Sequence, residues 1–260
     1  MIEFFQDALA ILSEHYPFLL RGVGYTMLIA LIGTLAGLLI GLATGVLRTC
    51  PMSKNPLVRI LQKIINGVIA AYVEVFRGTP MMVQAMVIYW GYAFASGGAT
   101  LPLIPSGILI VSINTGAYMA EIVRGGIISV DKGQFEGAAA VGMTHWQAML
   151  HIILPQVLRN ILPSVANEFV INIKDTSVLN VIGVTELYYF AGIIKRQTFQ
   201  TFQTYLVICV IYFILTFTVT RILRLIEKKL QVTDSFVICG SQSDPSAEIR
   251  VIKQPEVPND

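Results

Sequence analysis

The chain has 260 residues, of which 55% are hydrophobic and only 13% are charged, and its formal net charge is +2. This composition is too apolar for an ordinary soluble domain, so it excludes that class and favours a protein embedded in a membrane. The small net charge indicates no class of partner, and the positions of the charges along the chain carry more information.

Long uncharged segments predict the membrane spans. No Asp, Glu, Lys or Arg occurs in residues 26–47, 78–120 or 197–220, and the turn-rich residues 93–107 divide the middle segment into two halves. A spanning helix needs about 20 mostly apolar residues. We therefore predict an all-α membrane protein with about five spans, at residues 22–47, 79–95, 105–123, 161–184 and 203–224.

The basic residues predict the orientation. With the N-terminus outside and the C-terminus in the cytoplasm, most Lys and Arg residues fall on the cytoplasmic side, and only Arg21, Lys195 and Arg196 fall outside. This asymmetry is the one that the positive-inside rule expects, and the opposite orientation would invert it.

The segments around these spans are predicted as follows. Residues 1–21 form an extracytoplasmic segment, residues 22–230 form the membrane domain, and residues 231–260 form a polar cytoplasmic tail that is poorly ordered or peripheral. The first apolar run lacks a small-residue cleavage site, so we expect it to be retained as a helix. Residues 57–76 are apolar but contain Arg59, Lys63 and Glu74. We predict that they form a cytoplasmic lead-in helix in the membrane interface, because a further span would reverse the orientation of everything after it.

A glycine occupies every fourth position from Gly33 to Gly45 in the first predicted span. This spacing places the glycines on one face of a helix, where another helix can approach closely. Packing within the chain is the favoured interpretation, and packing against a partner subunit is the alternative.

The loop at residues 129–160 contains two signals for short helices. Asp131 with Gln134, and Thr144 with Gln147, each have the spacing of a capping box. We predict one helix that ends near Gly142 and a second that ends near Pro155. The first has a nearly bare face of small residues and Glu136 near its start, which suits insertion into a groove of another protein; folding back on its own chain is the alternative.

Several motifs in and around this loop resemble the permease subunits of ATP-binding-cassette importers. Glu136, Gly137 and Ala138, followed by Gly142 and by Pro155, are similar to the EAA loop of these permeases. Further matches narrow the resemblance to the polar amino acid uptake branch, the histidine, glutamine and arginine type; they are Arg77–Pro80, Gln84, Ala117–Tyr118, Glu121, Arg124–Ile127, Gly133–Gln134, Pro155–Gln156, Pro163 and Lys174–Ser177. The resemblance covers residues 22–230.

The resemblance implies the MetI-like fold of type I importers and a division of labour between subunits. It implies that the loop couples the permease to a separate ATPase, through Gln134, Glu136, Gly137, Ala138, Ala139 and Gly142. The implied partners are two ATPase subunits that use ATP and Mg, a second permease subunit that is identical or paralogous, and an extracytoplasmic binding protein that delivers a polar amino acid. Gly137 departs from the alanine usual in the family, which weakens the helix by about 1 kcal/mol.

Charged and polar residues in the predicted third and fourth spans are candidates for the translocation path. Charges at membrane depth are costly and face a bundle interior, a partner charge or a water-filled path. Asn172, Thr176 and Asn180 share a helical face and predict a polar stripe. The candidate path residues are Gln84, Asn114, Tyr118, Glu121, Asn172, Lys174, Thr176 and Ser177.

A structural alternative applies to several of these positions. Glu121 can pair with Arg124 at i+3, and Lys174 can pair with a carboxylate, in which case they hold a gate or a subunit interface. For Glu121 and Lys174 the structural or gating interpretation is favoured. Arg77 and Pro80 are predicted to mark the kink before the second span, and Arg124 and Pro155 are grouped with them as gating or structural residues.

Other functions find little support in the sequence. There is no phosphate-binding loop of the G-x-x-x-x-G-K-[ST] type and no catalytic constellation, so we predict a non-catalytic subunit. The three cysteines and three histidines have no metal spacing. The rival hypotheses are a proton-coupled secondary transporter and an accessory membrane subunit without its own path.

Overall fold

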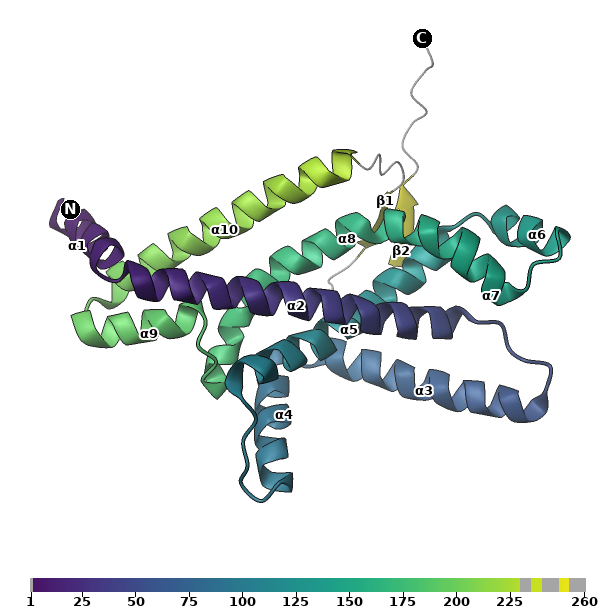
Figure 1. Cartoon of the computed structure of the whole chain (residues 1–260), viewed down its shortest axis with the longest axis horizontal. Helices are drawn as coiled ribbons and strands as arrows, with labels where there is room; N and C mark the ends of the chain where they lie inside the picture. The colour runs from purple at the N-terminus through teal and green to yellow at the C-terminus, as the bar shows by residue number, and fades with distance from the viewer. Residues whose placement is uncertain (1, 230–234, 240–247, 253–260) are drawn as a thin grey trace, which may run out of the picture. The chain divides into compact units, whose positions relative to one another are not determined.

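The computed structural model describes residues 2–229, 235–239 and 248–252, and the described part of the chain is almost entirely helical (Figure 1). Its α-helices are α1 (Ile2–Glu14), α2 (Tyr16–Thr49), α3 (Pro56–Gly78), α4 (Met81–Ala95), α5 (Leu103–Ser129), α6 (Lys132–Ala140), α7 (His145–Ala148), α8 (Leu154–Asp175), α9 (Leu187–Thr198) and α10 (Thr201–Lys229). A π-helical turn, Met149–Ile153, joins α7 to α8, and a 3-10 segment, Thr176–Ile182, follows α8.

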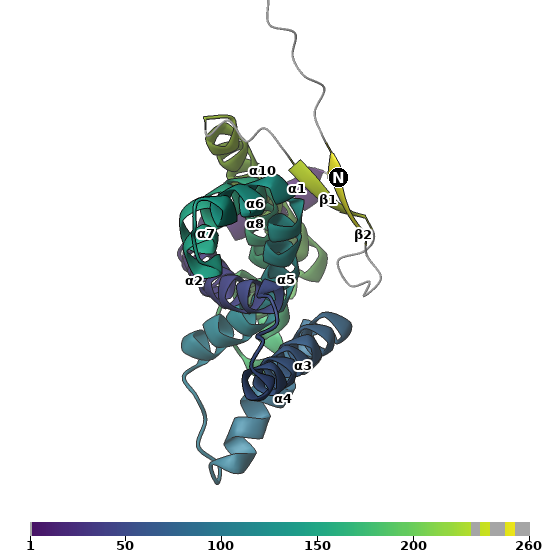
Figure 2. The ribbon, with the colours of Figure 1, turned by 90° about the vertical axis from the view of Figure 1, so that its right-hand side faces the viewer.

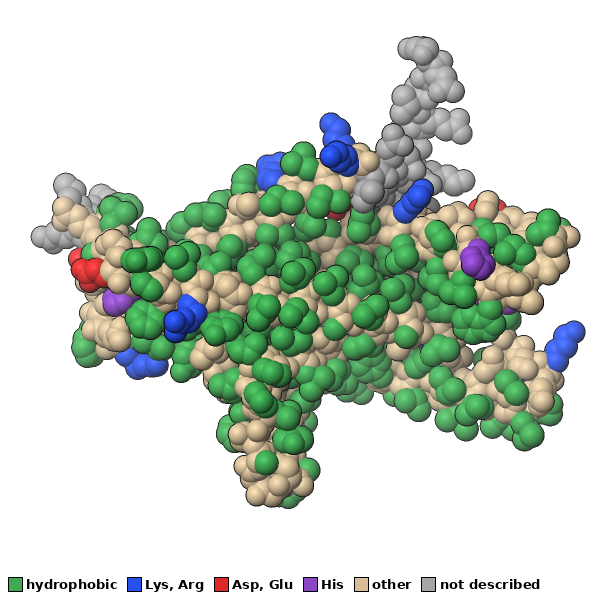
Figure 3. All heavy atoms as spheres, in the orientation of Figure 1, with side chains coloured by type: hydrophobic (Ala, Val, Ile, Leu, Met, Phe, Trp, Pro, Cys, Tyr) green, Lys and Arg blue, Asp and Glu red, His purple; other side chains and the backbone are tan. Residues whose placement is uncertain are grey.

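Five helical segments of the described chain are long and apolar enough to cross a membrane. They are Tyr16–Thr49, Pro56–Gly78, Leu103–Ser129, His145–Ile182 and Thr201–Lys229. Figure 3 shows hydrophobic side chains over much of α2 and α10 on the face drawn, with Lys and Arg toward the C-terminal end of α10. The predicted all-α membrane fold with five apolar helices is confirmed.

The set of five differs from the predicted one at α3 and α4. The predicted span at residues 79–95 is the helix α4, which has only 15 residues and therefore extends for about 22 Å, less than the roughly 30 Å hydrocarbon core. The predicted lead-in helix at 57–76 is α3, which has 23 residues and meets the length and composition of a span. Arg59 and Lys63, which spoke against a span in the sequence, lie within the first eight residues of α3 and leave the rest of the helix uncharged apart from Glu74 and Arg77.

The chain divides into two compact units, and four of the long helices contribute to both. The first unit comprises Met1–Ala36, Thr79–Ile113 and Asn167–Leu223. One of its cores joins Ile29 of α2 to Tyr89 of α4 and Ile110 of α5, together with Leu179 of the 3-10 segment. Its other core includes Ile11 of α1, Leu19 of α2, Leu187 and Ile194 of α9, and Ile208 of α10.

The second unit comprises Gly37–Gly78, Asn114–Ala166 and Arg224–Asp260. Its main core joins Val46 of α2 and Met119 of α5 to Met149 and Ile153 of the π-helical turn and Val157 of α8. Figure 2 views the end of this unit at which α6 and α7 lie.

The glycine seam packs within the chain. In the first unit, Gly33 faces the side chain of Val111 on α5. In the second unit, a Cβ at Gly37 would lie 2.8 Å from Thr115 Cβ, and one at Gly45 would lie 2.8 Å from Val123 Cβ. The absence of side chains along the seam lets the backbone of α2 lie directly against α5, where any side chain would clash. Packing of the seam within the chain, the favoured interpretation, is confirmed.

The tail contains an element that the sequence analysis did not foresee. Strands β1 (Ser235–Cys239) and β2 (Glu248–Ile252) pair antiparallel, with Val237 opposite Arg250. The rest of the predicted tail lies outside the described residues.

Candidate functional site

The loop between α5 and α8 folds as two short helices joined at a glycine. Asp131 caps α6 by accepting a hydrogen bond from Gly133 N at 2.6 Å, and Thr144 and Gln147 form a complete capping box at α7. Gly142 between them has a φ of +80°, a backbone conformation that favours glycine. The second capping box and the turn at Gly142 are confirmed. At the first cap, Gln134 instead accepts from Gln156 Nε2 at 3.4 Å.

One face of α6 is anchored and the other is exposed. Ala138 is buried, and Phe135 packs against the main core of the second unit. Glu136, Gly137 and Ala139 are exposed, as is Gly142. At the tip, 77% of Val141 is exposed. The loop therefore presents a surface of small side chains with one carboxylate, supported from below by apolar packing.

Pro155 does not end the second helix as predicted. The chain continues from α7 through the π-helical turn Met149–Ile153 into α8, and Pro155 is the second residue of α8. Proline has no N–H to donate, and its ring crowds the carbonyl four residues earlier; a single π-helical turn relieves both problems without breaking the helix. The loop is thereby joined to α8 by continuous helix.

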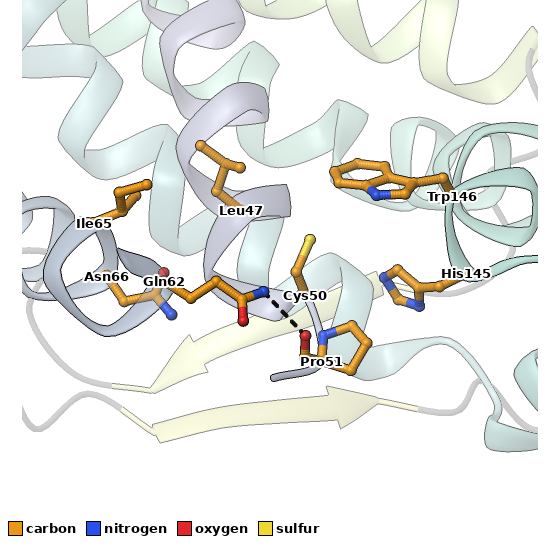
Figure 4. A pocket seen from close by; sticks show the side chains of 8 residues that line it. All are labelled: Leu47, Cys50, Pro51, Gln62, Ile65, Asn66, His145 and Trp146. Atoms are coloured by element: carbon orange, nitrogen blue, oxygen red, sulfur yellow. Dashed lines mark hydrogen bonds between the residues drawn. The ribbon is translucent and has the colours of Figure 1, made fainter. Parts of the chain in front are cut away.

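A cavity of about 190 Å³ lies beside α7 in the second unit (Figure 4). It is lined by the end of α2, the loop that follows, α3 and α7, through Leu47, Cys50, Pro51, Gln62, Ile65, Asn66, His145 and Trp146. Gln62 ties the loop to α3, since its Nε2 donates to Pro51 O at 3.2 Å and its Oε1 accepts from Ser53 N at 2.8 Å. Since α7 lines the same cavity as the end of α2 and α3, a displacement of α7 would change the shape of this cavity.

Glu121 of α5 is held by two arginines. Its Oε1 pairs with Arg48 Nη1 at the end of α2, and its Oε2 accepts from Arg124 Nε at 2.9 Å and Arg124 Nη2 at 2.7 Å. The pairing with Arg124 was among the predicted alternatives, whereas Arg48 was not foreseen. Both carboxylate oxygens are engaged in charge-assisted hydrogen bonds, and the carboxylate ties α2 to α5.

The end of α3 is linked to α5 at two further candidate positions. The guanidinium of Arg77 lies over the ring of Tyr118, 5.7 Å from its centroid. Asn114 Nδ2 donates to Phe76 O at 3.5 Å. α3 ends at Gly78 and Pro80 occupies the N-cap position of α4, so Thr79 and Pro80 form the break between the two helices.

The remaining candidate path residues belong to the first unit. Asn172 and Thr176 are buried, and Asn172 Nδ2 donates to Thr34 Oγ1 of α2 at 2.8 Å. Gln84 is also buried, and its Nε2 donates to both Thr79 O and Thr79 Oγ1 at 2.9 Å. Lys174 is exposed, while the Ser177 hydroxyl donates to the Lys174 carbonyl at 2.7 Å.

The predicted polar stripe extends over two residues and not three. At Thr176 the α-helix becomes a 3-10 helix. Three residues per turn replace 3.6, so position i+8 no longer shares the face of Asn172. Asn180 is exposed, in contrast to the buried Asn172 and Thr176.

A buried acid at the start of α9 was missed by the sequence analysis. Glu186 is fully buried, and its carboxylate accepts from Tyr188 N at 2.8 Å, Tyr189 N at 2.7 Å and Tyr212 Oη of α10 at 2.9 Å. Burial raises the pKa of this carboxyl above its ordinary value, although these hydrogen bonds favour the charged form. The available signal was that Glu186 is the only carboxylate between Asp175 and Glu227.

Glu186 belongs to a junction of three helices. Thr26 of α2, also buried, accepts from Leu187 N at 3.2 Å, so side chains satisfy the first three amides of α9. Gly22 permits the close approach, because a Cβ there would lie 2.8 Å from Leu187 Cα. No group of three or more metal-ligating side chains occurs in the described part of the chain.

Comparison with known proteins assigns the chain to a family. Residues 57–232 match the model of the family described as "Binding-protein-dependent transport system inner membrane component". The chain belongs to this family. It is a permease subunit, a component of the bacterial inner membrane, in a system whose ATP hydrolysis is supplied by a partner.

Relatives with known names cover most of this permease. It is 35% identical over 216 residues to the glutamine transport system permease protein GlnP of Escherichia coli strain K12, covering 83% of this chain and 94% of the relative. It is 34% identical over 221 residues to the putative glutamine transport system permease protein GlnP of Rickettsia bellii, covering 85% of this chain and 96% of that one.

Solved structures agree with the fold. A chain from the crystal structure of an amino acid ABC transporter with histidines superposes with a TM-score of 0.71 at 34% identity, covering 84% of this permease and 96% of that chain. A chain of the MetNI methionine ABC transporter in an inward-facing conformation gives a TM-score of 0.67 at 18% identity, covering 84% and 98%. At that identity the second likeness shows the fold alone. The predicted MetI-like fold is confirmed.

Proposed function

We propose that this permease, paired with a second permease subunit, forms the path of an ATP-driven importer for a polar amino acid. Two observations support the solute class. The named relatives at 34–35% identity are glutamine permeases matched over at least 94% of their length. The related transporter structure at 34% identity is an amino acid transporter with histidines.

The observation that carries the coupling proposal is the form of α6. Its exposed residues, Glu136, Gly137 and Ala139, form a surface of small side chains with one carboxylate. Ala138 is buried and Phe135 packs against the core, so the opposite face is held in place. A docking helix needs both features. Small exposed side chains let it approach the groove of a partner closely, and the packed face keeps the helix in place when the partner moves. The continuous helical connection from α7 into α8 then carries a movement of the loop into the membrane domain.

The proposed orientation places this loop in the cytoplasm, beside the ATPase. The N-terminus then lies outside, where an extracytoplasmic binding protein delivers the solute, and the Lys and Arg residues near the C-terminal end of α10 lie inside. Two ATPase subunits hold ATP and Mg, and one coupling loop of each permease docks on each ATPase. This chain supplies no catalytic group.

The polar residues divide into two proposed roles. Glu121, with Arg48 and Arg124, is a fastening between α2 and α5, because both of its oxygens are engaged. Asn172 and Thr176 are proposed to lie near the path, where a movement of α2 that opens the Asn172–Thr34 hydrogen bond would free an amide for solute.

The test compares docking and transport in two matched variants. Ala139→Leu adds bulk to the exposed face of α6, and Ala71→Leu makes the same change at an exposed position of α3. In complexes purified with the ATPase, Ala139→Leu should lower the recovered ATPase and ATP-driven uptake at least tenfold while the permease still inserts. Ala71→Leu should leave association with the ATPase unchanged.

Two results would count against the proposal. Uptake and ATPase recovery at wild-type levels in Ala139→Leu would show that α6 is not the docking surface. Uptake that continues without ATP and stops when the proton gradient is collapsed would favour a secondary transporter instead.

A further inference from the structure

The helix α1 has three faces, of which only one is accounted for by packing. Ile11 is 2% exposed and belongs to the core shared with α9 and α10. On the same side, Phe4 packs its ring 5.3 Å from that of Phe202 on α10, and Asp7 accepts from Gln203 Nε2 at 3.5 Å. This inner face fixes α1 against the start of α10.

A second face of α1 is apolar and exposed. Phe5 is 59% exposed, Leu9 64% and Leu12 44%. These residues are spaced at i, i+4 and i+7, so they form one stripe along the helix. Gln6 and Ser13, together with Glu14, are exposed on the third face, which is polar. The exposed surface of α1 therefore consists of an apolar stripe and a polar stripe that run along the helix beside each other.

Exposed apolar side chains also occur on the neighbouring elements of the same unit. Only His15 separates α1 from α2, whose exposed first turns carry Tyr16 and Leu20. Phe202, which contacts Phe4, is 70% exposed. Exposed apolar side chains therefore lie at the starts of the two span-length helices beside α1, and Trp and Tyr are enriched where such helices leave the hydrocarbon.

We propose that α1 lies in the interfacial layer of the bilayer, with Phe5, Leu9 and Leu12 among the lipid chains and Gln6 and Ser13 toward water. A second protein is a poorer occupant. The stripe has three side chains over about 10 Å of helix, which provides far less than the roughly 800 Å² per partner of a stable protein interface.

The charges of α1 restrict the kind of lipid surface. Its sequence contains Glu3, Asp7 and Glu14 and no Lys or Arg. Most interfacial helices use basic residues to bind anionic headgroups, and α1 cannot. Its insertion therefore rests on apolar burial and requires no anionic lipid.

The test measures which side of α1 meets lipid. Single cysteines at Phe5 and Leu9 (Phe5→Cys, Leu9→Cys), and matched ones on the polar face (Gln6→Cys, Ser13→Cys), carry a spin label in a chain whose native cysteines are replaced by serine or alanine. The full-length chain is reconstituted in phosphatidylcholine vesicles. Collision rates with oxygen, which concentrates in lipid, and with a water-soluble nickel chelate are compared.

The proposal predicts that the oxygen-to-nickel collision ratio at positions 5 and 9 exceeds that at 6 and 13 at least threefold. Adding phosphatidylglycerol should leave the ratio unchanged. Equal ratios on both faces would overturn the proposal, as would protection of positions 5 and 9 from both reagents, which would indicate a protein cover. If the cysteine-free chain does not insert, Phe5→Trp and Gln6→Trp in the native chain, with quenching by brominated lipid, distinguish the same outcomes.

This experiment requires neither the ATPase nor a solute. Its result is therefore independent of whether the permease carries an amino acid.

Discussion

The junction at Glu186 gives the sharpest stability prediction. Replacing Glu186 with alanine removes a buried acceptor from three part-buried donors, namely the amides of Tyr188 and Tyr189 and the hydroxyl of Tyr212. Each buried donor left without an acceptor costs about 1–3 kcal/mol, so we expect a loss of about 3–6 kcal/mol after partial relaxation. At about 2–4 °C per kcal/mol, the Tm should fall by at least about 6 °C.

Thermal unfolding of the purified permease in detergent measures this loss. Glu14→Ala is the matched control, because Glu14 is exposed at the end of α1 and the same atoms are removed. Its Tm should lie within about 1 °C of the wild type. A Glu186→Ala variant as stable as Glu14→Ala would refute the idea that this carboxylate holds α9 to α10.

The pH dependence of the same protein tests the buried carboxyl independently. Burial raises the folded-state pKa of Glu186 above that of the unfolded chain, so its contribution to stability is fully present below the unfolded pKa and is lost as pH rises through the folded pKa. Glu186→Gln does not titrate. The Tm difference, wild type minus Glu186→Gln, should therefore increase as pH falls through the folded pKa toward the unfolded pKa, and a constant or decreasing difference over that interval would contradict the assignment.

Three further predictions concern the glycine seam, the ion pair of Arg48 with Glu121, and the thiol of Cys50. Gly41→Ala should destabilise the permease, because the Cβ would clash with Met119, whereas Gly24→Ala, with open space around it, should be neutral or slightly stabilising; equal Tm values would contradict the seam. Arg48→Ala should cost about 1.5–3 kcal/mol, less than Glu121→Ala, since Arg124 still pairs with the carboxylate; a larger cost for Arg48→Ala would place its role elsewhere. Burial raises the pKa of the Cys50 thiol. With the other cysteines replaced, the alkylation of Cys50 by a water-soluble reagent should therefore need a higher pH than that of a free thiol. A midpoint of the alkylation rate at the pH of a free thiol would mean that the site is open.

Features that depend on neighbouring residues in sequence were predictable. The uncharged segments predicted the spans that became α2, α5 and α10, because twenty apolar residues have few alternatives to a membrane helix. The Thr144 capping box and the turn at Gly142 were predictable because each is set within four residues. The spacing of the glycines also predicted close packing against another helix, because it follows the helical repeat.

Features that depend on how distant helices pack were not predictable. Arg48 and Glu121 are separated by 73 positions and meet only because α2 approaches α5 along the glycine seam. The polar stripe failed at Asn180 because the backbone changes from 3.6 to 3 residues per turn at Thr176, which side-chain periodicity does not reveal. Pro155 was read as a stop, whereas a π-helical turn accommodates it.

The central claim is that this permease moves a polar amino acid by ATP hydrolysis in a partner subunit. The most direct measurement is uptake of radiolabelled glutamine into proteoliposomes that contain the permease, its ATPase and its binding protein, with ATP enclosed with the ATPase and a proton ionophore present. Uptake should require hydrolysable ATP and should fall at least tenfold in Ala139→Leu. Uptake that ignores ATP, or that survives Ala139→Leu at full rate, would contradict it.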